Sequence, residues 1–167
     1  VYIPADARVH HEHRKLKASA LILQNIRPIE NHECWSDPEF CQKVIHDSHD
    51  AFEYIKVQTD DICKYAIISY HENMKYIKTP SLELCEWAIR VTNGHVFPYI
   101  ENPIVTSNYD ICHLAISIKP QNLEYIETQT EELCKLAVSL NGLILKYVKD
   151  QTVEICRHAI INDSQAF

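Results

Sequence analysis

The sequence predicts an all-α protein, a solenoid-like stack of six short helix-turn-helix repeats. Three observations predict this class. One cysteine returns at a spacing of 22 residues, and the phrase around it carries the signals of a helix start each time. The segments between these phrases show no alternation of apolar and polar residues, which would be typical of strands.

Six cysteines mark the centres of the units. Their spacing is 22 residues within each group of three and 27 residues between the groups, and they are Cys41, Cys63, Cys85, Cys112, Cys134 and Cys156. Corresponding members of the two groups lie 71 residues apart, which predicts a triplet of units copied once. We therefore divide the chain into an N-terminal extension, residues 1–25, and a repeat array, residues 26–167, which we expect to be part of a longer array.

The first element of each unit is a helix that begins just before the cysteine. A residue suited to cap a helix N-terminus stands four positions before each cysteine, at Asp37, Thr59, Ser81, Asn108, Thr130 and Thr152. An acidic residue stands two positions before each cysteine, where it favours the positive end of the helix dipole, at Glu39, Asp61, Glu83, Asp110, Glu132 and Glu154. Each unit is therefore expected to start a helix at the cap.

The helix buries one face. In the unit of Cys134 this face holds Leu133, Cys134, Ala137 and Val138, whose spacing places them on one side of a helix, and the other units follow the same pattern. The small cysteine and alanine allow neighbouring helices to approach closely. One unit cannot bury this face alone, so neighbours are expected to stack.

The second element of each unit is a short apolar segment. Two-turn helices are expected here, with extended segments as the alternative, because six residues cannot decide the type by periodicity. Gly94 and Gly142 favour helices, since glycine commonly ends a helix and both precede such a segment. The segments are residues 51–56, 73–78, 96–101, 122–127 and 144–149.

The phrase YIETQTEELCKLAVSLNGLILKYVKDQTVEIC, residues 125–156, resembles the short helical repeats found in many copies in proteins of mimivirus-like giant DNA viruses. The resemblance covers residues 50–161 well and residues 26–49 weakly. The family's function is unknown, so the resemblance implies a helical repeat fold and no catalytic residues. It also implies a viral protein that works in the host cytoplasm or the virion.

The repeated cysteines are interpreted as small buried thiols. Equivalent positions in stacked helices lie about 10 Å apart, beyond the reach of a disulfide. Zinc sites need converging pairs of ligands, whereas these cysteines occur one per unit. A metal site is a weaker hypothesis for the segment that adds Cys34, His32 and the N-terminal histidines His10, His11 and His13.

Several function classes find no support in the sequence. The chain has two glycines and no phosphate-binding loop, no nucleophile elbow and no zinc-protease motif. The net charge is −7, which disfavours nucleic-acid binding, and no apolar run approaches the roughly 18 residues of a membrane span. We expect no enzyme activity and no cofactor.

The expected function is a non-enzymatic protein-interaction scaffold with an unidentified host or viral partner. Solenoids bind partners through positions that differ between repeats. The candidates are the residues after five of the cysteines, Lys64, Glu86, His113, Lys135 and Arg157, together with Asn31, Trp35 and Asn102 in two insert loops, Asn31–Ser36 and Asn102–Ser107. One alternative is a structural virion or assembly component that self-associates through its repeat ends. Another is a metal-binding protein that uses the histidine cluster and Cys34.

A further repeated residue is a tyrosine in each short segment. These tyrosines are Tyr54, Tyr76, Tyr99, Tyr125 and Tyr147. Each ring is expected to pack between units with its hydroxyl at the edge, and an exposed aromatic stripe for a partner is the alternative.

Overall fold

A computed structural model describes residues 36–162, and every regular element within that range is a helix. The chain divides into two compact units, Val1–Ile77 and Lys78–Phe167. The all-α prediction is therefore confirmed for the described residues. None of the described helices combines the length and the apolar character needed to cross a bilayer.

The described part of the first unit, residues 36–77, contains two α-helices, each followed by a 3₁₀ helix. Their order is α2 (Pro38–Asp47), η2 (His49–Tyr54), α3 (Asp60–Ser69) and η3 (His71–Tyr76). Helix α2 packs on α3, and η2 packs on η3. The unit thus has one layer of α-helices and one of 3₁₀ helices.

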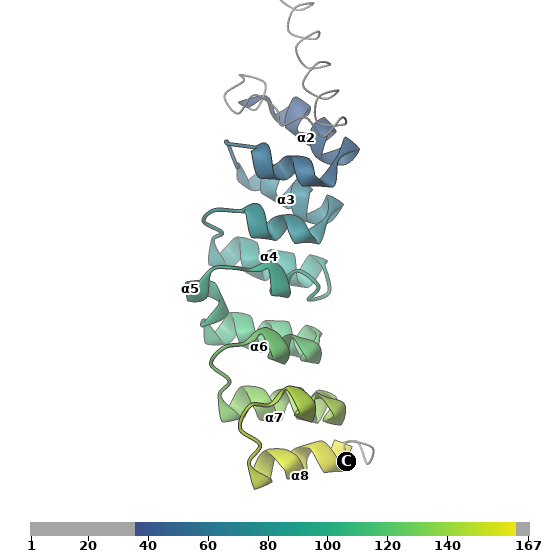
Figure 1. Ribbon diagram of the computed structural model, residues 1–167, viewed down its shortest axis with the longest axis vertical. Helices are drawn as coiled ribbons and strands as arrows, with labels where there is room; N and C mark the ends of the chain where they lie inside the picture. The colour runs from purple at the N-terminus through teal and green to yellow at the C-terminus, as the bar shows by residue number, and fades with distance from the viewer. Residues whose placement is uncertain (1–35, 163–167) are drawn as a thin grey trace, which may run out of the picture. The chain divides into compact units, whose positions relative to one another are not determined.

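The second unit repeats this plan. Its elements are α4 (Leu82–Val91), η4 (Phe97–Tyr99), α5 (Pro103–Thr106), α6 (Tyr109–Ile118), η5 (Pro120–Tyr125), α7 (Glu131–Leu140), η6 (Gly142–Tyr147) and α8 (Val153–Asn162). Helices α4, α6, α7 and α8 pack in sequence, and η4, η5 and η6 do the same. The rows formed by α6, α7 and α8 can be followed in Figure 1.

The helix starts lie where the caps predict them. The hydroxyl of Thr130 accepts a hydrogen bond from the N–H of Leu133 at 3.3 Å, which satisfies an open group of the first helical turn. Equivalent bonds occur at the other five caps, Asp37, Thr59, Ser81, Asn108 and Thr152.

The predicted core face is also confirmed. The alanine three residues after the cysteine is fully buried in the units where it occurs, at Ala66, Ala88, Ala115, Ala137 and Ala159. Cys134 and Val138 are at most 3% exposed, so this face packs as the spacing predicts. Fully burying a side chain as large as valine stabilises the fold by roughly 1.5–3 kcal/mol.

The short segments are helices of the 3₁₀ type. Backbone hydrogen bonds span three residues, for example from the N–H of Ile126 to the carbonyl of Leu123 at 3.2 Å. The tight winding places Leu123 and Ile126 on one buried face. The expected helical type is confirmed, but each 3₁₀ helix ends two residues before its predicted segment does, the residue that follows it is extended, and η4 has three residues instead of the expected two turns.

The two glycines play different parts. After α4, Asn93 and Gly94 both have positive φ, and the N–H of Gly94 bonds the carbonyl of Ile89 at 2.8 Å, so this helix ends in a Schellman turn. Gly142, by contrast, is the first residue of η6, and α7 ends at the extended Asn141. The expectation that Gly142 ends a helix by its own conformation is wrong, because an extended residue alone separates the two helices there.

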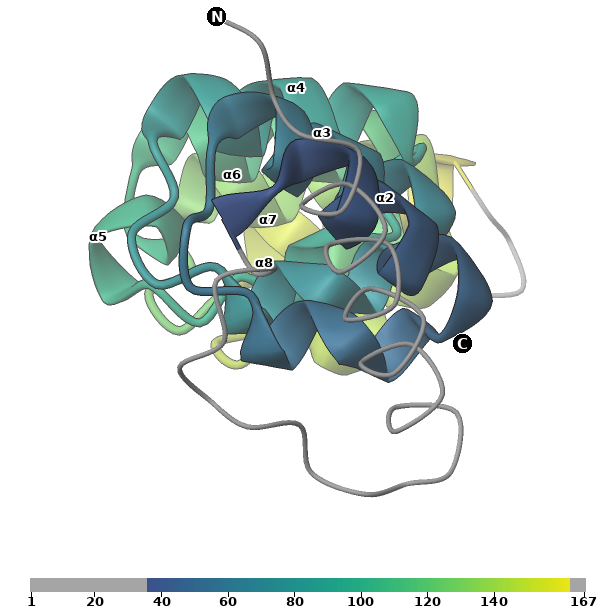
Figure 2. The same ribbon diagram turned by 90° about the horizontal axis from the view of Figure 1, so that it is seen from above.

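The second insert is more ordered than a loop. Asn102 caps the four-residue helix α5, its side chain accepting from the N–H of Ile104 at 3.0 Å, and Val105 is buried. Helix α5 packs on α6 and projects at the edge of this unit in Figure 2. The prediction of a loop over Asn102–Ser107 is therefore wrong in its central part.

Candidate interaction surface

The repeated cysteines are structural. All six within residues 36–162 are free thiols, five of them buried, while Cys156 is half-buried. Burial raises the pKa of Cys63, Cys85 and Cys112 to about 11, and at Cys63 the charge of Asp60 adds to the effect. A thiol with such a pKa is almost fully protonated near pH 7, so these groups are poor nucleophiles and poor metal ligands.

The residue after each cysteine lies on the outer side of its helix. Glu86, His113 and Arg157 are exposed, and Lys64 and Lys135 are half-buried. The backbone position is the same in each repeat, while the side chain is lysine in two of these repeats and glutamate, histidine or arginine in the others.

Most of these charges have a partner one turn away. Glu86 pairs with Arg90 at 2.8 Å, and Lys135 pairs with Glu131 at 2.8 Å. The hydrogen bond that the ammonium group of Lys135 donates to Glu131 is the main cause that raises the pKa of Lys135. Exposed pairs of this kind add little stability, so a partner's charges could replace them at small cost.

Seven other predicted positions lie in a part of the chain that the structure does not describe. Asn31, His32, Cys34 and Trp35 lie outside the described residues, as do His10, His11 and His13. Residues 36–162 contain no group of three or more side chains able to hold a metal ion.

The tyrosines of the short helices are mostly half-buried. Tyr54, Tyr76, Tyr99 and Tyr147 belong to this class, while Tyr125 is 50% exposed. The ammonium groups of Lys75 and Lys146 lie 4.8 and 4.7 Å from the ring centres of the tyrosines that follow them. These cation–π contacts fix the two lysines against the surface.

A cavity of about 420 Å³ lies in the second unit, between the linkers that precede α7 and α8. Three acidic residues, Glu127, Glu131 and Asp150, and one lysine, Lys149, line it, together with Cys134 and Ile155 at the helices. The lining is thus acidic on balance, and its remaining part includes apolar groups. A cationic side chain with an aliphatic stem has matching chemistry.

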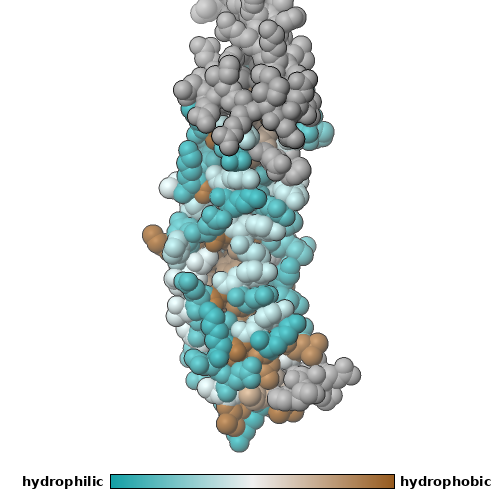
Figure 3. Space-filling view, viewed as in Figure 1, coloured by the Kyte–Doolittle hydropathy of each residue, from teal (hydrophilic) through white to brown (hydrophobic). Residues whose placement is uncertain are grey.

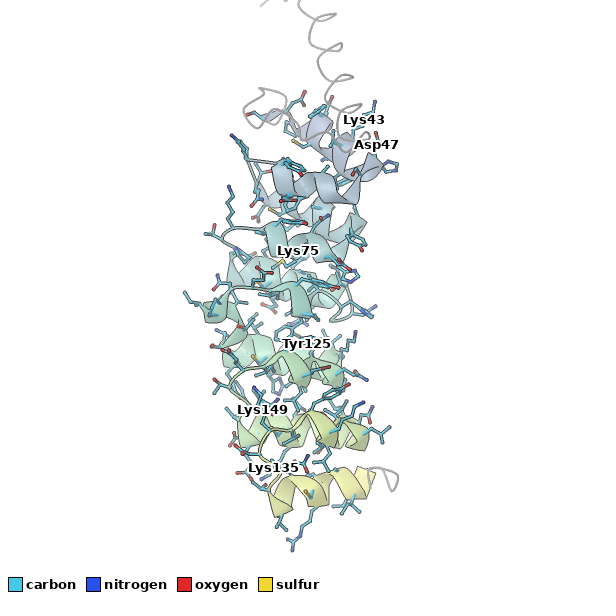
Figure 4. All side chains as sticks on the ribbon, in the orientation of Figure 1. Lys43, Asp47, Lys75, Tyr125, Lys135 and Lys149 are labelled. Atoms are coloured by element: carbon cyan, nitrogen blue, oxygen red, sulfur yellow. The ribbon has the colours of Figure 1, made fainter. Side chains whose placement is uncertain are left out.

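A lysine and a glutamine hold the cavity walls together. Lys149, labelled in Figure 4, donates from its ammonium group to the carbonyls of Ile126 at 3.1 Å and Glu127 at 2.8 Å. Its own N–H donates to the side-chain oxygen of Gln129 at 3.0 Å. The ammonium charge is therefore directed at backbone carbonyls of the preceding repeat.

Sequence reasoning did not find this cavity. The available signal was the presence of acidic residues before and after the dipeptide Gln-Thr that precedes each of the last two helices, in ETQTEE and in KDQTVE. Of these acids only Glu132 and Glu154 were interpreted, as helix-start signals, and neither lines the cavity. Placing Glu127, Glu131 and Asp150 around one space requires two neighbouring repeats.

A serine, a histidine and a glutamate also meet at the surface of α7 and α8. Ser139 Oγ lies 3.4 Å from His158 Nδ1, and His158 Nε2 lies 4.0 Å from Glu154 Oε1. The order resembles a hydrolase triad, but the second distance exceeds a hydrogen bond, so the glutamate does not orient the imidazole as a catalytic base requires.

Comparisons of the chain with protein-family models, with curated proteins and with solved structures found no match.

Proposed function

We propose that the chain is a non-enzymatic protein-interaction scaffold, built as a solenoid of six repeats that arose from a duplicated triplet. Matched hydrogen bonds support the duplication. The amide of Gln58 donates to the carbonyl of Tyr76 at 2.8 Å, and that of Gln129 donates to the carbonyl of Tyr147 at 3.0 Å. Both members of the second bond follow those of the first by 71 residues.

The observation that carries the proposal is the constant core and the variable outer position. The α-helix of every repeat except the last buries its cysteine, and the next residue is exposed or half-buried and varies among the repeats after the first, being lysine in two of them and glutamate, histidine and arginine in the others. Selection for folding alone does not require such variety at one exposed position. An extended surface with several chemistries suits a protein partner.

The acidic cavity adds a specific recognition element. We propose that it takes an arginine or lysine side chain of the partner, whose charge Glu127 and Asp150 would neutralise together with Glu131, which would give up its pair with Lys135. The aliphatic stem would contact Cys134 and Ile155. The partner should therefore present a basic segment.

The proposed setting is the host cytoplasm or the virion of a giant DNA virus. This part of the proposal rests on the resemblance of residues 125–156 to viral helical repeats. Free thiols in the core fit a reducing compartment. The partner would be a host or viral protein.

The test is a comparison of partner recovery by two matched variants of the full chain. The first replaces the residues after the cysteines with alanine, and these are Lys64, Glu86, His113, Lys135 and Arg157. The control replaces exposed charges on the short helices, Glu53, Lys75, Glu124 and Lys146. We expect quantitative mass spectrometry to show partners that are lost from the first variant and kept by the control. Equal recovery by both variants would contradict the proposed surface.

The cavity is tested separately with synthetic peptides. A partner-derived peptide with a central arginine should bind wild type more tightly than the Glu131→Gln/Asp150→Asn variant. The same peptide with citrulline in place of arginine should bind both proteins equally weakly, since it has the same shape without the charge. Tight binding of the citrulline peptide to wild type would show that the cavity does not recognise the positive charge of the peptide.

A further inference from the structure

One exposed position near the end of each α-helix changes character between the two units. It is the sixth residue after the cysteine, and it is exposed in all five repeats in which the structure describes its side chain. In the first unit it is polar, at Asp47 and Ser69, whereas in the second it is apolar, at Val91, Ile118 and Leu140, which are 47%, 36% and 51% exposed. Helix α6 packs between α4 and α7, so the exposure of Ile118 is a property of this position and not of an uncovered end.

The three apolar side chains form a ladder along one edge of the second unit. They occupy the same turn of α4, α6 and α7, which pack in that order, so successive rungs lie about 8–10 Å apart, one spacing between helix axes. A Cβ at Gly94, just after α4, would lie 3.6 Å from the side chain of Ile118, so the ends of α4 and α6 are side by side. Figure 3 shows hydrophobic surface at the right-hand edge of the second unit, at the level where α7 ends in Figure 1.

The chain around the apolar ladder carries positive and no negative side chains. The segments 87–100, 111–123 and 133–149 each hold one rung and contain no aspartate or glutamate, although the whole chain has a net charge of −7. Lys119 directly follows the rung of α6, and its Nζ lies 3.0 Å from Nδ1 of His95. No carboxylate of the described residues pairs with Lys119. Acidic groups of a partner would therefore be attracted to this edge.

The spacing of the apolar ladder suits an α-helix laid across the ends of α4, α6 and α7. Residues seven apart in an α-helix lie on nearly the same face at about 10.5 Å, close to the spacing of the rungs. A helix also satisfies its own backbone hydrogen bonds, whereas the aliphatic rungs offer no partners to the open N–H and C=O groups of an extended segment. About 15 residues of helix would span the three rungs.

We propose that the apolar ladder of Val91, Ile118 and Leu140 binds an acidic amphipathic helix of a partner protein. Apolar residues at every seventh position of that helix would contact the rungs, and its carboxylates would face Lys119 and His95. This surface is a second one, with a charge preference opposite to that of the acidic cavity. It contains none of the residues directly after the cysteines and none of the cavity residues.

The test measures peptide binding to the full chain by fluorescence anisotropy. The probe is a synthetic helical peptide of about 15 residues, with leucines along one face at every seventh position and glutamates on both sides of them. A matched peptide carries lysine in place of each glutamate. Wild type should bind the glutamate peptide at least about 10-fold more tightly than the lysine peptide, and the difference should shrink as added salt screens the charges.

Protein variants test whether the apolar ladder is the binding site. The ladder variant is Val91→Ser/Ile118→Ser/Leu140→Ser, because α3 carries serine at this position. It should bind the glutamate peptide at least about 10-fold more weakly than wild type, since the apolar contacts are lost. The control variant replaces three exposed apolar residues elsewhere with serine, and these are Ile68, Leu82 and Ile104. It should bind like wild type, and circular dichroism should show the same helix content in all three proteins.

Four binding results would overturn the proposal. They are no binding of the glutamate peptide to wild type at about 1 mM, equal or tighter binding of the lysine peptide, wild-type affinity in the ladder variant, and an equal loss in the control variant. Sedimentation of wild type alone supplies a further one. A dimer that the ladder variant loses would show that a second copy of the chain covers these residues.

A single change of charge decides the matter if the ladder variant loses helix content. Lys119→Glu should weaken binding of the glutamate peptide and strengthen binding of the lysine peptide, because it reverses the charge beside Ile118. An unchanged preference in Lys119→Glu would contradict the acidic partner. Either failure leaves partner recovery through the residues after the cysteines unaffected, so the two surfaces are tested independently.

Discussion

Replacing Gln129 with alanine should destabilise the second unit more than the same change at the matching position of the next repeat. The side-chain amide of Gln129 donates to the carbonyl of Leu123 at 2.9 Å and to that of Tyr147 at 3.0 Å. Its side-chain oxygen accepts from the N–H of Lys149 at 3.0 Å. One side chain thus joins two successive repeats.

The magnitude follows from counting these bonds. A hydrogen bond contributes about 1 kcal/mol net, so Gln129→Ala should lower the free energy of unfolding by about 3 kcal/mol. Gln151 occupies the same register, but its amide donates to the carbonyl of Leu145 alone among the described residues, at 3.0 Å. Gln151→Ala should therefore cost about 1 kcal/mol, and the two changes share the same loss of side-chain volume.

The assay is urea unfolding followed by circular dichroism, with thermal melts as a second measurement. For a chain of this length, each kcal/mol shifts the melting temperature by about 2–4 °C, so the losses should be roughly 6–12 °C and 2–4 °C. Equal losses for the two variants would refute the reasoning, because they would show that the bonds to the next repeat contribute nothing beyond those within a repeat.

Three further predictions concern single positions. Gly94→Ala should lower the unfolding free energy by about 2–4 kcal/mol, because φ at Gly94 is +76° and a Cβ there would lie 2.8 Å from Lys119 Cβ. A measured loss below about 1 kcal/mol would contradict this close approach. Asn122→Asp should lower the unfolding free energy by about 3–5 kcal/mol, a larger loss than Asn122→Ala should cause. The fully buried amide of Asn122 donates to the carbonyls of Gly94 and Ala115 at 3.0 and 3.1 Å, and a carboxylate would face both oxygens. Equal losses for the two variants in urea unfolding would count against this reasoning. Burial raises the pKa of Cys85 from 9.0 to about 11, so the unfolded chain loses this proton first as pH rises, and stability should be full below pH 9 and fall toward pH 11. The fall between about pH 8 and pH 10.5 should be smaller by roughly 1–2 kcal/mol in Cys85→Ala, and an identical fall would exclude this thiol as a cause.

The α-helices were predictable because their signals are local. A cap such as Thr130 needs only its own next turn to accept a hydrogen bond, and Glu132 needs only the dipole of its own helix. The buried face could also be predicted, since the spacing of Leu133, Cys134 and Ala137 places them together on any helix. These features require no knowledge of neighbouring repeats.

Predictions failed where the answer depended on other segments. Gly142 was expected to end a helix as Gly94 does, yet it begins one. The residue type alone does not distinguish the two positions. The insert before Cys112 was expected to be a loop, but burial of Val105 against α6 allows a helical turn there. Both outcomes depend on packing between elements.

The candidate surface was predictable only in part. The residues after the cysteines were expected to face outward, and Glu86, His113 and Arg157 do so, whereas Lys64 and Lys135 are half-buried. The acidic cavity could not be predicted, because its walls come from two linkers more than 20 residues apart along the chain.

The sequence by itself determined the repeat length, the helix starts and the face that each helix buries, because these depend on spacing and on contacts within one or two turns. The tertiary structure decided how one repeat meets the next: the glutamine that joins two carbonyls, the cavity between linkers, and the apolar ladder along the ends of α4, α6 and α7. These features depend on contacts between segments far apart in sequence, which the pattern within one repeat does not contain.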